Sequence, residues 1–158
     1  MSDFSHIDDT NQPSMVDISG KSPNHRTAVA QSIVQLTESI WEQLHNGEIH
    51  NKKGPVFQTA IIAGVMAAKK TSDLIPLCHP LPLNNCKITI DPIDDQQVKI
   101  LCSVSTDHKT GVEMEALTGA SVAALTLYDM CKALSHDIRI LETCLLSKTG
   151  GKRDFSRD

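Results

Sequence analysis

The order of the predicted secondary-structure elements indicates an α+β fold in which helices pack on one face of an antiparallel sheet. Several short segments alternate apolar and polar residues and are rich in β-branched side chains, as half-buried strands are. Longer segments carry apolar residues at helical spacing. From Arg26 onward the order is β-α-α-β-β-α-β, and leaving out the first, short helix gives β-α-β-β-α-β. This is the pattern of a ferredoxin-like sandwich, whose second sheet face oligomerisation would cover.

The first half of the chain is expected to contain the following elements. Residues 1–13 are polar and are expected to be disordered, and residues 15–18 are expected to form a short strand. The β-branched run at 26–36 predicts a longer strand. Apolar residues at helical spacing predict a helix over 36–44, which Asn46 and Gly47 would end. A loop over 48–55 then leads into a second helix at 56–70.

The second half begins with a proline-punctuated segment, 73–83, which cannot form regular structure. Alternating residues predict strands at 87–91 and 98–105, joined by a hairpin turn at 92–96. A long helix is predicted from about residue 112 to 134, and a final strand from 138 to 147. A basic tail follows at 148–153, and we expect it to be mobile. Residues 14–158 are therefore expected to form a single domain.

Composition excludes several classes of protein. The chain has 158 residues, 40% hydrophobic and 22% charged, which suits one compact domain with a core. A net charge of −4 and 3% aromatic residues argue against nucleic-acid binding, which uses cations and stacking rings. No apolar run reaches the ~18 residues of a membrane span, and the acidic start fits neither a signal nor a transit peptide. Five cysteines without C-x-x-C spacing fit reduced core residues, so we expect a soluble cytoplasmic protein.

The predicted long helix has charged residues along one face. Asp129 and Lys132 are three residues apart and are therefore neighbours on the helix surface. Glu115 falls within about 40° of the same line. The residues between these charges on that face are small or apolar, which suits a packed face, where a charge needs a partner. A structural ion pair on an exposed helix is the alternative interpretation.

The length of this helix bears on where a site could lie. Glu115 and Asp129 are ~21 Å apart along the axis, so one small-molecule site cannot easily use both. Two such helices packed antiparallel across a two-fold axis would bring Glu115 of one subunit beside Asp129 and Lys132 of the other. If these residues act together, the site is expected to lie between subunits.

A second candidate is His79, which lies between Cys78 and Pro80. Nearby prolines stiffen its backbone, and a side chain that titrates near neutrality suits proton transfer or phosphate contact. A histidine that is hydrogen-bonded only within a loop is the alternative. Zinc binding by Cys78 and His79 is disfavoured, because adjacent residues in an extended loop point apart and no third ligand is suitably spaced. No metal site is predicted.

A third group is cationic and lies in glycine-containing loops: Lys52, Lys53, Lys148, Lys152 and Arg153. Such loops suit phosphate contact, although the tail lacks the spacing of a P-loop. Solubilising surface charge is the alternative. Taken together, the three groups indicate acid–base chemistry on a small phosphorylated substrate.

Six segments together resemble the cyclic pyranopterin monophosphate synthase family of molybdenum cofactor biosynthesis. The resemblance covers residues 14–155, and its segments are MVDIS (15–19), KG (53–54), DLIPLCHP (73–80), KTGVEMEALT (109–118), AALTLYDMCK (123–132) and KTGGK (148–152). It implies a phosphorus–oxygen lyase that converts 3′,8-cyclo-7,8-dihydroguanosine 5′-triphosphate into cyclic pyranopterin monophosphate and releases pyrophosphate. It also implies a ferredoxin-like catalytic domain and a homohexamer, a trimer of dimers with sites at the dimer interfaces.

The resemblance assigns roles residue by residue. It implies that Asp129 is catalytic, that Lys132 is its proton-transfer partner and that Lys53 is a second catalytic lysine. The loop before Gly54 is longer than in some relatives, which leaves Lys52 open as the alternative to Lys53. The implied substrate-binding residues are Leu77, Cys78, His79, Glu113, Met114, Glu115, Lys148 and Arg26.

No resident cofactor is implied, and magnesium on the substrate triphosphate is compatible with the chemistry, since hard cations bridge phosphates and carboxylates. Two other hypotheses remain open on the sequence. One is a catalytically silent oligomer that binds a nucleotide or pterin, which would have no use for the pair Asp129–Lys132. The other is an unrelated hydrolase or cyclase of the same fold that releases pyrophosphate from GTP itself.

Overall fold

The main sheet is antiparallel throughout, and the computed structural model describes it within residues 5–158. Its strand order is β5-β6-β1-β7-β8. The strands are β1 (Asn24–Gln35), β5 (Asn85–Pro92), β6 (Gln97–His108), β7 (Arg139–Thr149) and β8 (Phe155–Ser156). The predicted α+β class with an antiparallel sheet is confirmed.

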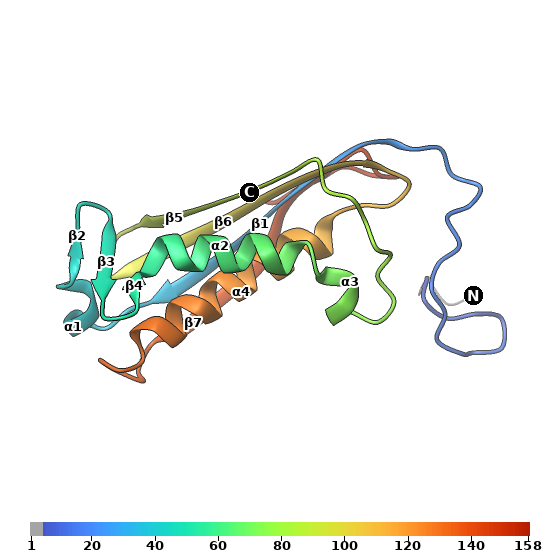
Figure 1. The fold of residues 1–158 in the computed structure, drawn as a ribbon. Coiled ribbons are helices and arrows are strands. Elements are labelled where there is room, and N and C mark those ends of the chain that lie inside the picture. Colours follow the sequence, from blue (N-terminus) through green and yellow to red (C-terminus); the bar gives the residue numbers. More distant parts are fainter. Residues whose placement is uncertain (1–4) are drawn as a thin grey trace.

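Two long helices, α2 (Val56–Ala68) and α4 (Glu113–Cys131), lie side by side on the same face of this sheet (Figure 1). Alternate residues of the two central strands face these helices and are buried, as the period of two requires. Small side chains on α4 let it lie close to the sheet. The inward-facing residues include Ala28, Ala30 and Val34 on β1, Val98 and Ile100 on β6, and Ala116, Ala120 and Ala123 on α4.

The two helices cross at a pair of glycines. A Cβ atom on Gly64 of α2 would lie 2.7 Å from the carbonyl oxygen of Gly119 on α4. Real Cβ atoms do not approach a backbone oxygen so closely, so the crossing distance depends on glycine at this position.

A second, smaller sheet replaces the predicted loop at 48–55. It contains β2 (Leu44–His45), β3 (Glu48–Asn51) and β4 (Gly54–Pro55), and it follows a one-turn helix, α1 (Glu38–Trp41). The helix predicted over 36–44 is therefore too long. Asn46 and Gly47 have φ of 53° and 76° and form the two-residue turn between β2 and β3. Asn-Gly favours such hairpin turns, and here it joins two strands instead of ending a helix.

Four other segments differ from or add to the predictions. Residues 15–18 form no strand, so that prediction is wrong, and the Val16 carbonyl oxygen instead accepts a hydrogen bond from His79 Nε2 at 2.8 Å. A one-turn helix, α3 (Thr71–Leu74), overlaps the start of the proline segment. The predicted basic tail, 148–153, begins within β7, and a short strand after it, β8, pairs with β7. The predicted disorder of residues 1–13 lies partly outside the described residues; within them, Ile7 pairs with Pro13 in an isolated bridge.

Candidate active site

One cluster of predicted residues lies at the C-terminal end of α4, beside the small sheet (Figure 1). Lys132 Nζ is 2.7 Å from Asp129 Oδ1, and Lys53 Nζ is 3.4 Å from Asp129 Oδ2. We call Lys53, Asp129 and Lys132 the C-end cluster. Lys53 comes from the turn between β3 and β4, so the cluster joins two elements far apart in sequence.

The charges of the C-end cluster support one another. Hydrogen bonds from Lys132 and then from Lys53 lower the pKa of Asp129, and the hydrogen bond to Asp129 raises the pKa of Lys132. These shifts keep the carboxylate ionised and Lys132 charged at neutral pH, which are the forms that a proton acceptor and a proton donor need. The Asp129 side chain is 56% exposed in the single chain, so all three groups are open to a ligand or a partner.

The structure places Lys53, and not its neighbour, against Asp129. Lys53 follows Asn51 by two residues, and its backbone N–H donates to Asn51 Oδ1 at 2.8 Å. Lys52 is exposed, and the ion pair to Asp129 from this turn is made by Lys53. Of the two lysines, Lys53 is the one that contacts Asp129, and its catalytic role stays a prediction.

A second cluster lies at the N-terminal end of α4 and lines a cavity of about 280 Å³. We call it the N-end cluster: Leu77, Cys78, His79, Glu113, Met114 and Glu115 in the cavity wall, with Lys148 and Arg26 beside it. The segment after α3 supplies the first three, and the first turn of α4 supplies the next three. Lys148, on β7, pairs with Glu113 Oε1 at 2.8 Å.

Glu115 is the most unusual titrating group of the N-end cluster. Its residue is only 4% exposed. Burial raises the pKa of its carboxyl to about 7, and the nearby Glu113 charge acts in the same direction. Burial likewise raises the pKa of the Cys78 thiol. Near neutral pH Glu115 can therefore be present as an acid, in contrast to Asp129.

Arg26 and the loop after β7 form the rim of the N-end cluster. Arg26 Nε donates to the His108 carbonyl oxygen at 2.9 Å, and its Nη2 donates to the Lys109 carbonyl oxygen at 3.2 Å. The adjoining groove has a volume of about 420 Å³, and its lining includes three cationic residues, Lys21, Arg26 and Lys152. A concave surface with several cations attracts phosphates.

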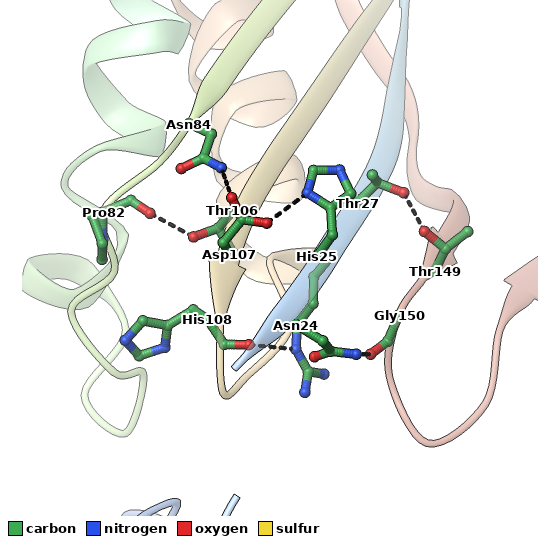
Figure 2. Close-up of polar contacts among 11 residues, drawn as sticks. Asn24, His25, Thr27, Pro82, Asn84, Thr106, Asp107, His108, Thr149 and Gly150 are labelled. Carbon is green, nitrogen blue, oxygen red and sulfur yellow. Dashed lines mark hydrogen bonds and ion pairs between the residues drawn. The ribbon is translucent and has the colours of Figure 1, made fainter. Parts of the chain in front are cut away.

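Hydrogen bonds join the ends of three strands, β1, β6 and β7, at this rim (Figure 2). Asn24 Nδ2 donates to the Gly150 carbonyl oxygen at 2.6 Å, and the Thr27 and Thr149 hydroxyls are 2.7 Å apart. Gly150 has φ of 80°, and a Cβ atom there would collide with the His25 carbonyl oxygen. Glycine is therefore required for the loop to turn back over β1.

The two clusters do not meet within one chain. Glu115 and Asp129 both belong to α4, as predicted, and regular helix geometry separates them by ~21 Å along its axis. The buried start and exposed end of the helix also show that its charged face is packed only in part. The structure adds one polar residue that sequence reasoning missed, Asn51, although an asparagine before a two-residue turn is a recognisable turn signal.

The described residues contain no evident metal centre. Among residues 5–158, no three His, Cys, Asp or Glu side chains gather closely enough to hold a metal ion. In the same range, no helix is both long and apolar enough to cross a membrane.

Comparison with known proteins gives a consistent result. The family model described as the MoaC family matches residues 15–151. A cyclic pyranopterin monophosphate synthase of Xanthomonas campestris pv. campestris is 54% identical, over 96% of this chain and 92% of that protein. A protein of the same name from Bacillus thuringiensis is 49% identical over 99% of both. A molybdenum cofactor biosynthesis bifunctional protein of Synechocystis is 56% identical over 98% of this chain, which spans about half (46%) of that relative.

Proposed function

The chain belongs to the MoaC family, and from that premise we propose that it is a lyase that forms cyclic pyranopterin monophosphate in molybdenum cofactor biosynthesis. The proposed substrate is 3′,8-cyclo-7,8-dihydroguanosine 5′-triphosphate, and the second product is pyrophosphate. The observation that carries the proposal is the distribution of the residues that the resemblance implicates. Every one of them lies in the C-end cluster or the N-end cluster, at the two ends of α4.

The proposed chemistry fits the protonation states of these groups. Rearranging a purine into a pterin opens and closes rings and moves protons. Asp129 as a base and Lys132 as an acid can carry out these proton transfers. In the phosphoryl step, a hydroxyl of the ribose-derived part gives its proton to a basic group or water, its oxygen bonds to the α-phosphorus, and the bond from that phosphorus to pyrophosphate breaks. Lys148, which pairs with Glu113, and Arg26 and Lys152, which line the adjoining groove, would stabilise the negative charge of the leaving group. Any magnesium would enter with the triphosphate.

We propose that each complete site combines two subunits. Asp129 and Glu115 are too far apart on α4 to reach one small substrate, whereas an antiparallel, two-fold pair of these helices would bring them together. Exposed apolar side chains on the helix layer, such as Ile62, Met66 and Leu125, are consistent with a covered surface in the assembly. Following the family resemblance, the proposed assembly is a homohexamer arranged as a trimer of dimers.

We also propose that the fold is ferredoxin-like. The long elements follow the order β1, α2, β5, β6, α4, β7, and their strands lie in the order β5-β6-β1-β7. This matches the split β-α-β arrangement, in which the two central strands are the first and third of the motif. The small sheet and β8 are additions to it.

The test of function is a direct assay with two substrates. Purified protein is given the cyclised GTP derivative or plain GTP, and pyrophosphate and the fluorescent oxidised pterin are measured. Both products are expected from the cyclised derivative and neither from GTP. Pyrophosphate from GTP would favour an unrelated hydrolase or cyclase, and binding without turnover would favour a silent oligomer.

The test of the composite site is complementation between two inactive variants. Glu115→Gln and Asp129→Asn subunits are purified separately and then mixed under conditions that allow subunit exchange. Part of the activity is expected to return, because one of the two sites at each mixed interface would have both native residues. No recovery, despite exchange demonstrated by mass spectrometry of labelled subunits, would place each site within a single chain.

A further inference from the structure

We infer that Asn51 is a positioning residue that holds Lys53 against Asp129; this inference rests on the proposed function. Asn51 is the last residue of β3, and the turn that follows it contains Lys52 and Lys53. Its side chain forms hydrogen bonds with the backbone of Lys53 and with the backbone of Met130, the residue after Asp129. It therefore links the hairpin to α4 at the place where Lys53 meets Asp129.

Two hydrogen bonds define this link. Asn51 Nδ2 donates to the Met130 carbonyl oxygen at 2.6 Å, and Asn51 Oδ1 accepts from the Lys53 backbone N–H at 2.8 Å. The partners fix the orientation of the amide, because a carbonyl oxygen can only accept and a backbone N–H can only donate. The Met130 carbonyl belongs to the last turn of α4, where carbonyls lack partners within the helix. With one side chain, Asn51 thus gives a hydrogen bond to a carbonyl at the end of α4 and accepts one from the backbone of the turn.

The pair Lys53–Asp129 needs such a support. Its Nζ–Oδ2 distance is 3.4 Å, and the Lys53 side chain is 58% exposed. Exposed ion pairs of this kind contribute little on their own and do not hold long side chains in one position. Asn51 is half-buried at the end of β3, and its two hydrogen bonds connect the backbone of the following turn to the backbone of the last turn of α4. Asn51 therefore fixes the backbone of Lys53 relative to the end of α4, and this sets where the Lys53 side chain meets Asp129.

The other end of the same hairpin is held by a different residue. The buried carboxylate of Glu48 accepts hydrogen bonds from the backbone N–H groups of Ile49, Phe57 and Gln58, at 2.7 to 3.1 Å. These bonds attach β3 to the first turn of α2 and do not involve α4. Glu48 is thus a matched comparison: it holds the hairpin in the fold but does not set its distance from Asp129.

The experiment is a double-mutant cycle between Asn51 and Lys53 with the cyclised GTP derivative as substrate. In the otherwise native protein, Asn51→Ala is expected to lower kcat by about 10- to 100-fold with little change in KM, the scale of a small misplacement of a reacting group. In the Lys53→Ala background, the same change is expected to lower kcat by less than about twofold, because the group that it positions is already gone. Equal losses in both backgrounds, or no loss in the native one, would overturn the inference.

Two further measurements separate positioning from folding and from the proposed function. Asn51→Asp keeps the acceptor for Lys53 but cannot donate to Met130; it is expected to lower kcat without preventing folding and serves if Asn51→Ala does not fold. The pKa of Asp129, followed by NMR of carboxyl-labelled aspartate, is expected to rise in Asn51→Ala and not in Glu48→Gln. An unchanged pKa would count against the inference even if the native chain proved inactive, whereas an inactive native chain by itself contradicts only the proposed function.

Discussion

Asp129 is the residue on which the proposed chemistry depends most, because both lysines of the C-end cluster contact its carboxylate. We expect Asp129→Asn and Lys132→Ala each to lower kcat at least ~10²-fold, the usual loss for a missing general base or acid. Both side chains are about half exposed, so neither change should prevent folding. Steady-state kinetics and thermal melts measure the two effects separately.

The matched control for Asp129→Asn is Asp91→Asn. Asp91 is an exposed aspartate on the edge strand β5, away from both clusters. Its substitution removes the same charge and is expected to leave kcat unchanged. Near-native kcat in both Asp129→Asn and Lys132→Ala would remove the pair from the mechanism.

Glu115 predicts a particular dependence of stability on pH. Its pKa is about 7 in the folded chain, against an ordinary value of 4.5. The folded state therefore holds this proton more tightly, so the stabilisation is complete below about pH 4.5 and is lost as the pH rises through about 7. We expect native protein to lose roughly 1–3 kcal/mol relative to Glu115→Gln between pH 5 and pH 8.

Urea unfolding of the two proteins across this pH range measures the difference. Other groups titrate equally in both proteins, so the comparison isolates Glu115. Parallel stability curves for the two proteins would contradict the raised pKa of Glu115.

At the level of single residues, the sequence predicts which charged groups belong to the candidate site, but not which residues hold them in position. The spacing of Asp129 and Lys132 alone placed them side by side, because a helix fixes neighbours three residues apart. Asn51 was missed because its two partners lie on different elements, and the distance between those elements depends on tertiary packing. The raised pKa of Glu115 was missed for the same reason, since burial is a property of the folded chain.

At the scale of elements, long segments were predicted well and short ones poorly. The strands β1, β5 and β6 and the helices α2 and α4 have strong periodicity, and their predicted ranges are close to the observed ones. The small sheet was missed because its strands are too short to show a period. Its Asn46–Gly47 turn was interpreted as a helix stop, although the same dipeptide favours a hairpin.

The close crossing of α2 and α4 predicts that a glycine-to-alanine substitution there lowers the stability of the protein instead of raising it. Alanine normally stabilises a helix by about 1 kcal/mol over glycine. Gly64→Ala is instead expected to destabilise the protein by about 1–3 kcal/mol, because the added methyl group meets the Gly119 carbonyl oxygen. Chemical denaturation measures the change. Gly20→Ala is the control, since nothing lies within 4 Å of a Cβ atom there, and a stabilised Gly64→Ala protein would mean that the helices have room to separate.

At the scale of the whole molecule, the α+β class followed from the order of periodic segments. The need for a second subunit, which rests on the length of one helix, stays a prediction. The direction in which subunits would meet did not follow, because it depends on which side chains remain exposed once the helices and the sheet have packed. Ile62 and Leu125 are examples, since apolar residues at helical spacing are normally expected in the core.

The separation of the two clusters at opposite ends of α4 determines how a defective subunit affects the native subunits with which it pairs. If each helix gives its first turn to one site and its last turn to another, a subunit with both Glu115→Gln and Asp129→Asn spoils both sites of any pair that it joins. Such a subunit would be dominant negative. In an equal random mixture with native chains, about one quarter of the activity should remain, against about one half if each chain held its own site. Co-expressing the two forms at measured ratios in a cell that needs the product would distinguish a linear loss of function from a quadratic one.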